Sequence, residues 1–387
     1  MQKKLIVLAL ASAFAAPAFA ATSNVDIYGQ FDVSVDYASG MRNSVSGIGT
    51  ANSNHAWRLS SNVSRIGLKG SEDLGGGLAA IWQFEQGVNL DGGATSSGWG
   101  NQRNTFLGLK SNFGTLLAGT HDTPYKLSTS SLDPFADSAG DYNAIIGSFL
   151  GLNTSDLRLG NVLAYISPNF SGLTAAVATS FLREQGQTNV DGKPSAWTGM
   201  VNYANGPLYL AGGYEIAKHV DPNFAGANDV DIRSWKLGAG YTLGNFTVNA
   251  IYDNIKVSDN IGNVFGTTTD KKRSAWGLNG VYNMGNIALK AGYYHAGKVT
   301  DLSDSAANMY EVGADYNLSK RTKLYAVYSK VQNDNNATYC AGGSASAGFG
   351  SSGISATACP GVNVVGPNAN PTGKDPSIFA VGMRHTF

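Results

Sequence analysis

The residue types that most often bind metals or catalyse reactions are scattered along this chain. No two histidines share metal-ligand spacing on one predicted element, so we interpret them as surface residues or residues at a membrane interface. The five are His55, His121, His219, His295 and His385. We therefore predict no metal site.

Two segments approach nucleotide-binding motifs without fulfilling them. Gly292 to Lys298 (GYYHAGK) nearly matches a phosphate-binding loop, but Val299 replaces the required Ser or Thr and no helix follows. The glycine pattern from Gly348 to Gly353 lies in a low-complexity loop, where glycines match by chance. A nucleophile elbow is missing as well. The sequence therefore predicts no enzyme and no cofactor.

The first twenty residues have the pattern of an export signal. Lys3 and Lys4 precede an apolar run from Leu5 to Ala16, and Ala18-Phe19-Ala20 forms a small-residue cleavage site. An uncleaved membrane anchor is the alternative, although the run is shorter than the roughly 20 residues of a spanning helix. We expect residues 1–20 to be a signal peptide and residues 21–387 to form one domain.

The two cysteines, Cys340 and Cys359, share one stretch rich in Gly, Ser and Ala. In an exported chain we expect them to form a disulfide that closes a surface loop.

The overall composition excludes several classes of protein. Lys+Arg and Asp+Glu both number 27, so the chain lacks the basic excess that attracts nucleic acid. It is 43% hydrophobic, and its 49 glycines have no period of three, which excludes disordered and collagen-like chains. After Ala20 no apolar run is long enough for a membrane helix.

Apolar residues instead alternate with polar or small ones along most of the chain, which is the period of a β-strand. In Phe246 to Asp253, the residues Phe246, Val248, Ala250 and Tyr252 share one face. The same division recurs in Trp235 to Tyr241 and in Ile287 to Tyr294, where Lys236, Gly238, Gly240, Lys290 and Gly292 lie on the polar face.

The connections between these segments alternate in length. Seven are tight and rich in Asn, Gly or Pro, and eight are longer polar loops, the largest at about 122–160 and 333–376. Together they join sixteen strands. An even number of antiparallel strands, with short turns on one rim and long loops on the other, is typical of a transmembrane β-barrel. A large secreted all-β protein is the alternative.

Six segments of the chain have specific motifs. They are VDIYGQF (25–31), SRIGLKGSEDLGGG (64–77), RNTFLGLKSNFGTLLAG (103–119), YISPNFSGL (165–173), YNLSKRTKLYAVY (316–328) and FAVGMRHTF (379–387). With these motifs the chain resembles the general trimeric porins of Gram-negative bacteria, particularly the beta-proteobacterial branch. The resemblance spans nearly the whole mature chain.

The resemblance implies an all-β, sixteen-stranded antiparallel transmembrane barrel with short periplasmic turns and long extracellular loops. The barrel would assemble as a homotrimer in the outer membrane, with its third long loop folded inward. Acidic residues of that loop, Asp133, Asp137 and Asp141, would face a basic wall at the pore constriction. The family's motifs place Arg65, Arg103 and Arg158 on that wall. Phe387 resembles the terminal signal that the barrel-assembly machinery reads. Thr120, His121 and Asp122 stand where related porins often have an arginine.

These features predict a water-filled channel for passive diffusion of ions and small hydrophilic solutes. Three arginines facing three aspartates would cancel in charge, so we expect weak ion selectivity and leave its sign open. Membrane lipids and lipopolysaccharide are the expected partners, and nucleic acid is not.

Other interpretations stay open at this point. The channel could be specific for one substrate, or the barrel could be a scaffold for an enzyme or adhesin. The arginines could be rim charges that contact solvent or lipopolysaccharide. The aspartates could cap short helices or form turns.

Overall fold

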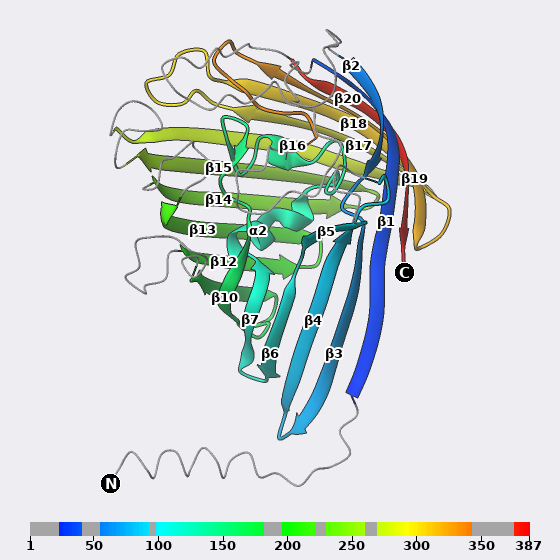
Figure 1. Cartoon of the computed structure of the whole chain (residues 1–387), viewed down its shortest axis with the longest axis vertical. Helices are drawn as coiled ribbons and strands as arrows, with labels where there is room; N and C mark the ends of the chain where they lie inside the picture. Colours follow the sequence, from blue (N-terminus) through cyan, green and yellow to red (C-terminus); the bar gives the residue numbers. More distant parts are fainter. Residues whose placement is uncertain are drawn as a thin grey trace.

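The computed structural model describes residues 23–40, 55–92, 98–181, 196–220, 230–259, 269–342 and 375–387. Nearly all of them belong to one antiparallel sheet that closes on itself as a barrel (Figure 1). Its strand segments are β1 (Ser23–Ser39), β2 (His55–Ser61), β3 (Arg65–Gly75), β4 (Leu78–Val88), β5 (Trp99–Gln102), β6 (Thr105–Ser111), β7 (Gly114–Asp122), β10 (Arg158–Ile166), β11 (Leu173–Ser180), β12 (Ala196–Asn205), β13 (Leu208–Val220), β14 (Val230–Leu243), β15 (Phe246–Asp259), β16 (Lys271–Met284), β17 (Ile287–Ala296), β18 (Ala307–Asn317), β19 (Thr322–Asn333) and β20 (Ser377–Thr386).

Two pairs among these segments are single strands with an irregularity in the middle. β2 and β3 both pair with β1 and are separated by a bulge at residues 62–64, where Val63 has φ 53°. β5 and β6 both pair with β4 and are separated at residues 103–104. The barrel therefore has sixteen strands, which confirms the predicted fold.

The barrel closes where the two ends of the chain meet. β1 pairs with β20 along Gln30 to Ser39 and with β3 along Ser23 to Gln30. The last residue takes part, because Phe387 exchanges two backbone hydrogen bonds with Gly29, of 3.0 and 3.1 Å. Its ring also lies edge-on to Phe31, with 5.1 Å between the centroids. Among the described strands of the large sheet, closure leaves no edge with unpaired backbone groups.

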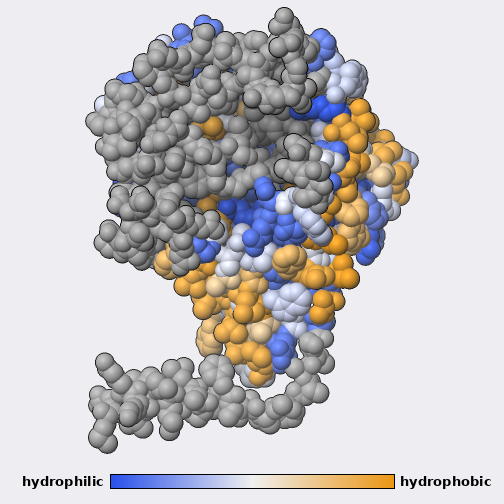
Figure 2. Space-filling view, in the orientation of Figure 1, coloured by the Kyte–Doolittle hydropathy of each residue, from blue (hydrophilic) through white to orange (hydrophobic). Residues whose placement is uncertain are grey.

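The two faces of the sheet differ as the alternation predicts. On β14, Trp235 and Leu237 are exposed on the outer face, whereas Lys236 between them is fully buried on the inner face. Figure 2 shows apolar side chains gathered over the lower, strand-covered part of the visible surface. Exposed apolar residues outside and polar residues inside are the arrangement of a barrel in lipid.

The tight connections lie where the sequence places them, for example Gly244-Asn245 between β14 and β15. Several glycines there have positive φ, among them Gly206, Gly244 and Gly285, as short hairpins require. Within the described ranges, no helix is long and apolar enough to cross a membrane. The predicted signal peptide, Cys359 and residues 343–374 of the last predicted loop lie outside the described residues.

Residues 123–157, here called loop 3, fold into the barrel (Figure 1). They contain the helix α2 (Pro124–Thr129), the 3₁₀ turns η1 (Ser130–Leu132) and η2 (Tyr142–Ala144), and the short hairpin β8 (Ser148–Phe149) and β9 (Leu152–Asn153). Thr123 caps α2 by accepting a hydrogen bond from the backbone N–H of Lys126, at 3.2 Å. α2 and η1 pack against the inner faces of β12 to β15.

Glycines on the inner wall make room for loop 3. A Cβ atom at Gly238 would lie 2.5 Å from Leu132 Cδ1 and 2.8 Å from Thr129 Cγ2. A Cβ at Gly240 would lie 2.9 Å from Leu132, and one at Gly313 would lie 2.9 Å from Phe135. The glycines that alternate along these strands therefore let the loop approach the sheet closely.

Buried ion pairs fix the second half of loop 3. Asp156 pairs with Lys236, whose Nζ also lies 4.2 Å from the centre of the Tyr125 ring. Arg273 pairs with Asp253 and donates to the carbonyl of Ile145 at 2.9 Å. Neither pair has any exposed side-chain surface. Breaking a buried pair leaves an uncompensated charge, so these contacts hold the loop against the wall.

Replacing Gly238 by valine should therefore loosen loop 3. Overpacking typically costs about 1–3 kcal/mol, which corresponds to roughly 5- to 150-fold faster hydrogen exchange of the loop amides. The matched control is Gly212→Val on the neighbouring strand, because a Cβ there meets no atom closer than 3.6 Å. Equal exchange rates in both variants would show that the glycines do not seat the loop.

Candidate functional site: charged groups between loop 3 and the barrel wall

The three predicted arginines all lie at irregularities of their strands. Arg65 directly follows the bulge at residues 62–64, and Arg103 lies in the break between β5 and β6. Arg158 begins β10, next to a register shift between Leu159 and Val162. Because bulges change the direction in which side chains point, such positions can project long side chains into the lumen.

Asp137 of loop 3 meets Arg65. Its Oδ2 lies 3.1 Å from Arg65 Nη1, and both side chains keep some exposure, 31% for the aspartate and 22% for the arginine. The backbone of Asp137 is left-handed, with φ 60°, a conformation that Asp and Asn tolerate better than most residues. Loop 3 thus presents one accessible carboxylate to the arginine wall.

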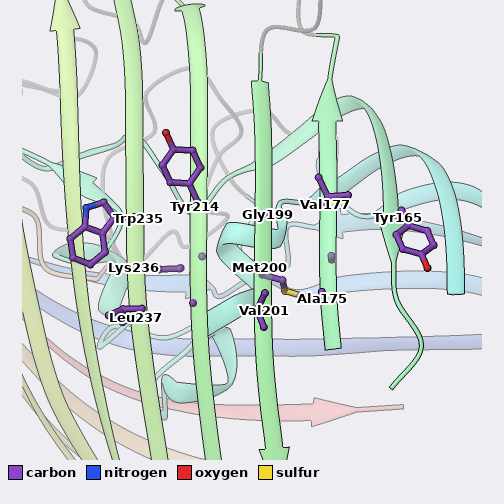
Figure 3. A pocket seen from close by; sticks show the side chains of 13 residues that line it. Tyr165, Ala175, Val177, Gly199, Met200, Val201, Tyr214, Trp235, Lys236 and Leu237 are labelled. Atoms are coloured by element: carbon purple, nitrogen blue, oxygen red, sulfur yellow. The ribbon is translucent and has the colours of Figure 1, made fainter. Parts of the chain in front are cut away.

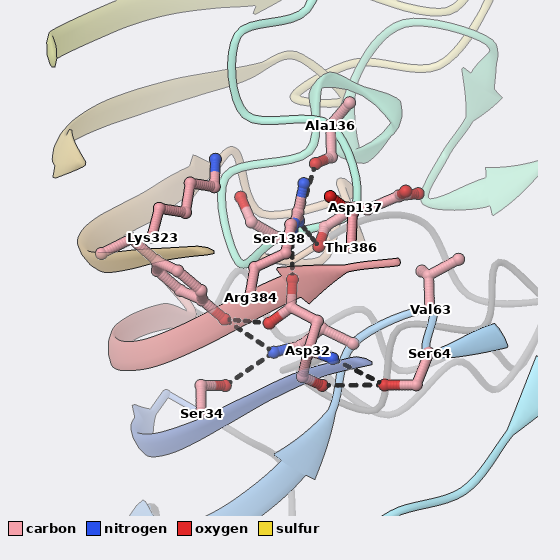
Figure 4. A network of polar contacts seen from close by, with 12 residues as sticks. Asp32, Ser34, Val63, Ser64, Ala136, Asp137, Ser138, Lys323, Arg384 and Thr386 are labelled. Atoms are coloured by element: carbon pink, nitrogen blue, oxygen red, sulfur yellow. Dashed lines mark hydrogen bonds and ion pairs between the residues drawn. The ribbon is translucent and has the colours of Figure 1, made fainter. Parts of the chain in front are cut away.

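Arg384 of β20 holds the loop 3 backbone next to the contact between Asp137 and Arg65 (Figure 4). Its Nη2 donates to the carbonyls of Asp137 and Ala136, at 2.8 and 3.3 Å. Its Nε pairs with the fully buried Asp32, which also accepts a hydrogen bond of 2.7 Å from Tyr325. The same Asp32 holds the bulge at residues 62–64, because its backbone exchanges hydrogen bonds with the Ser64 hydroxyl. One network therefore ties the loop, the bulge and the barrel closure together.

Glu85 of β4 provides the acidic partner for two arginines. It pairs with Arg103, and its Oε2 lies 3.9 Å from Arg65 Nε and accepts a hydrogen bond from Tyr28 at 3.0 Å. The sequence did not single out Glu85, although it lies in an alternating strand segment. Only the fold shows that Glu85 lies between the two arginines.

Arg158 belongs to a separate group. Its Nη2 lies 3.0 Å from Asp122, its Nε donates to Asn104 at 2.9 Å, and Lys126 of α2 also pairs with Asp122 at 3.2 Å. Asp122 is part of the segment where related porins often carry an arginine. This chain therefore has an acidic residue in that segment, and it forms ion pairs with two basic side chains, Arg158 and Lys126.

Asp133 and Asp141 make turn hydrogen bonds within loop 3. Asp133 accepts from the backbone N–H groups of Phe135 and Tyr142, at 2.8 and 3.1 Å. Asp141 accepts from those of Asn143 and Asp137, at 2.8 and 3.2 Å. Both side chains are buried, so of the three predicted aspartates the structure brings Asp137 alone to an arginine among the described residues.

Three further charged residues extend the wall beyond the predicted ones. Asp315 pairs with Lys290 at 2.8 Å and with Lys323 at 2.7 Å. Lys290 also donates to the carbonyl of Pro134 in loop 3 and lies 4.8 Å from the centre of the Phe135 ring. The alternation of polar and apolar residues predicts that all three lie on the inner face, but it does not predict that they lie beside loop 3.

Among the described residues, no group of three His, Cys, Asp or Glu side chains could hold a metal ion.

A comparison with known families places this architecture. The model of the Gram-negative porin family matches residues 7–336. The chain belongs to the Gram-negative porin family.

Relatives and solved structures agree with this assignment. The major outer membrane protein P.IB of Neisseria meningitidis is 30% identical over 328 residues, which cover 83% of this porin and 91% of that protein. The solved anion-selective porin from Comamonas acidovorans matches with a TM-score of 0.72 and 26% identity, over 94% of this porin and 100% of that chain.

A more distant match is the trimer form of OmpT from Vibrio cholerae. Its TM-score is 0.64 at 17% identity, over 94% of this porin and 99% of that chain, which shows the shared fold. The porin is therefore an outer-membrane barrel that forms a passive channel, and its family indicates a channel rather than an enzyme.

The aspartates of loop 3 differ in how readily they ionise. Burial opposes ionisation of Asp137, but the charges of Arg65, Arg384 and Arg103 outweigh it and lower its pKa. Burial raises the pKa of Asp141 to about 6, with a further contribution from Asp137. Burial and the nearby Asp141 raise the pKa of Asp133 well above its usual range. Of these three aspartates, Asp137 is therefore the one that stays ionised across the physiological range.

The different contacts predict different effects for two substitutions in loop 3. Asp133→Ala removes the acceptor of two backbone N–H groups and should destabilise the loop by about 1–3 kcal/mol, measured by hydrogen exchange. Asp137→Asn should keep the loop protected, because Asn tolerates the same φ, but should shift the reversal potential in a salt gradient toward anions. The opposite pattern would assign the turn to Asp137 and the lumen charge to Asp133.

Proposed function

We propose that this porin is a general diffusion channel with a weak preference for anions. Its constriction would lie between loop 3 and the wall that carries Arg65, Arg103, Arg158 and Arg384. The single observation that carries the proposal is the relative exposure of the paired charges. In most of the partly exposed ion pairs between Arg or Lys and Asp or Glu described above, the cationic side chain is more exposed than the carboxylate that pairs with it.

The exposures support the proposed sign, which the sequence left open. The side chains of Arg65, Lys323 and Lys126 are 22%, 24% and 29% exposed. Their partners Glu85, Asp315 and Asp122 are 8%, 9% and 12% exposed. Three pairs show the reverse order: Asp137 is 31% exposed against 22% for Arg65, Asp315 9% against 6% for Lys290, and Asp122 12% against 11% for Arg158. A solute in the lumen would therefore meet more accessible positive than negative charge, which favours anions.

The same geometry explains why selectivity should be weak. Each of the basic side chains described above has a nearby carboxylate, which cancels most of its electric field. Salt further screens the remaining field beyond the Debye length, about 8 Å at physiological salt. The paired charges across the opening still orient water and dipolar solutes. An apolar solute would have to displace this ordered water, so small hydrophilic compounds are favoured.

We also propose that the porin assembles as a homotrimer without catalytic activity. Its resemblance to general porins supports the trimer, and so does the fold shared with the trimer form of OmpT. Membrane lipids and lipopolysaccharide would surround the assembly. β20 and the Phe387 that follows it would form the segment that the barrel-assembly machinery recognises.

Planar-bilayer recording tests the channel and its basic wall together. The porin should insert as large ohmic conductances in groups of three, with a reversal potential slightly on the anion side. Replacing Arg65, Arg103 and Arg158 by Gln should shift that potential toward cations. The control is Arg321→Gln in the exposed turn between β18 and β19, which should leave it unchanged. A folded barrel without conductance would refute the channel, and an unchanged potential in the triple variant would refute the location of the constriction.

Ion selectivity should also depend on pH through Asp141. Because its pKa is about 6, above the ordinary value, the carboxyl takes up a proton as the pH falls from 7 to 5. One negative charge is then lost beside the lumen, and the reversal potential should move toward anions. Asp141→Asn should reduce this shift. A shift of the same size in the variant would assign the titration to another group.

A further inference from the structure

The first residues of the last long loop give loop 3 a second support besides the barrel wall. Residues 334–341, here called the loop 8 root, directly follow β19. Ala337, Tyr339, Cys340 and Ala341 have no exposed surface. Burial of this extent is typical of a close-packed core and not of a free surface loop. The start of this loop is therefore part of the packed interior.

The loop 8 root meets loop 3 at the tip of the β8–β9 hairpin. The Thr338 hydroxyl donates a hydrogen bond to the carbonyl of Leu150, at 2.5 Å. The next residue, Gly151, has φ 82°, and a Cβ atom there would lie 2.1 Å from the Thr338 carbonyl oxygen and 3.1 Å from Tyr339 Cα. So close an approach of two backbones requires glycine. The hairpin and the loop 8 root are therefore in direct contact.

The ring of Tyr339 continues this contact into the apolar interior. It belongs to one buried cluster with Ile145 and Ile146 of loop 3 and with Val331 of β19. Burial raises the pKa of its hydroxyl, and the charge of the nearby Arg273 opposes that rise. Buried aromatic rings dominate the packing of such contacts. Tyr339 is therefore the main apolar link between the loop 8 root and loop 3.

The loop 8 root is in turn fixed to the barrel. Asn333, the last residue of β19, forms two hydrogen bonds with the backbone of Tyr339, of 2.9 and 3.0 Å. The N–H of Asp334 donates to the carbonyl of Ala306 at 2.9 Å, and the N–H of Ala306 donates to the Asp334 carboxylate at 3.3 Å. Cys340 is also disulfide-bonded. These bonds fix the root on both sides of Tyr339.

The β8–β9 hairpin is thus held by two different parts of the chain. Phe149 and Leu152 pack in a second apolar cluster with Ile255 and Val257 of the wall. The tip at Gly151 contacts the loop 8 root. Apolar packing against the wall has no preferred direction, whereas the hydrogen bond and the close backbone approach at the tip allow one position only. The loop 8 root therefore determines where the hairpin lies.

A series of hydrogen bonds connects the hairpin with the charged face of loop 3. The side-chain amide of Asn143 donates to Asp156 at 2.9 Å, which joins the segments before and after the hairpin. Asp141 accepts hydrogen bonds from the backbone N–H groups of Asn143 and Asp137. Asp137 then pairs with Arg65. A shift of the hairpin would therefore reach the accessible carboxylate through groups in direct contact.

From these contacts we infer that the loop 8 root is a positioning element of the channel and that Tyr339 is its central residue. By holding the hairpin in one place, the root would keep Asp137 opposite the arginine wall. A loosened hairpin would let loop 3 fluctuate within the lumen and obstruct ions for short periods. The inference rests on the proposed function, which places the constriction between loop 3 and that wall.

Truncation of the Tyr339 ring tests this role. Tyr339→Ala should speed the hydrogen exchange of the amides of residues 148–153 by roughly tenfold or more, because the lost ring leaves a cavity. In planar bilayers the open channel of this variant should show more frequent brief closures. Tyr339→Phe keeps the ring and should restore both properties. The matched control is Tyr214→Ala on the outer face of β13, beside a lipid-facing apolar depression (Figure 3), which should leave both unchanged.

A methyl group at Gly151 tests the contact at the hairpin tip directly. Gly151→Ala would push the hairpin and the loop 8 root apart, so exchange should rise in residues 148–153 and in residues 334–341. The matched control is Gly244→Ala between β14 and β15, where φ is also positive, at 57°, but a Cβ meets nothing within 4 Å. It introduces the backbone strain without the collision. Gly151→Ala combined with Tyr339→Ala should have a less than additive effect, since both break the same contact.

Two results would overturn the inference. One is unchanged exchange of residues 148–153 in both Tyr339→Ala and Gly151→Ala. The other is faster exchange without more frequent closures, because the root would then stabilise the loop without affecting the channel. All these variants should keep a large ohmic conductance, so failure of the inference leaves the proposed channel intact. Absence of conductance in the unaltered porin would instead refute the proposed function.

Discussion

The structure depends on one constraint: every backbone N–H and C=O group of a strand in hydrocarbon must find a partner within the protein. A sheet meets this requirement only by closing on itself, and here the first and last strands, β1 and β20, complete the ring. Closure produces an outer face in lipid and an inner face in water. It also produces two rims, because antiparallel strands return through tight turns at one end and leave long loops at the other.

The inner face is then shaped by what must fit inside the ring. Loop 3 enters the lumen because glycines such as Gly238 and Gly313 leave space for it, and because Asp156 finds a buried cation at Lys236. Its other side presents Asp137 to Arg65. The loop is therefore held by apolar packing and buried charge on one side, and it takes part in an accessible charged surface on the other. The anchoring contacts and the accessible charge thus lie on different faces of the same segment.

Much of the fold could be predicted from the sequence, because a side-chain period of two assigns each residue to a face and Asn, Gly and Pro mark the turns. The polar face assigned to Lys236, Gly238 and Lys290 agrees with the structure. The pairing of charges could not be predicted in this way. The alternation of side chains along a strand predicts that Glu85 and Arg384 face the lumen. It predicts neither their positions along the barrel axis nor their neighbours across the lumen. The turn contacts of Asp133 and Asp141 depend on the folded loop, which no period describes.

The contact between Gly29 and Phe387 has a consequence for how the protein is made. β20 and Phe387 complete the ring, so a chain without them would leave β1 without its partner strand. The unpaired backbone groups of that open edge could pair with strands of other chains. Truncation near Phe387 is therefore expected to give aggregates rather than a smaller pore.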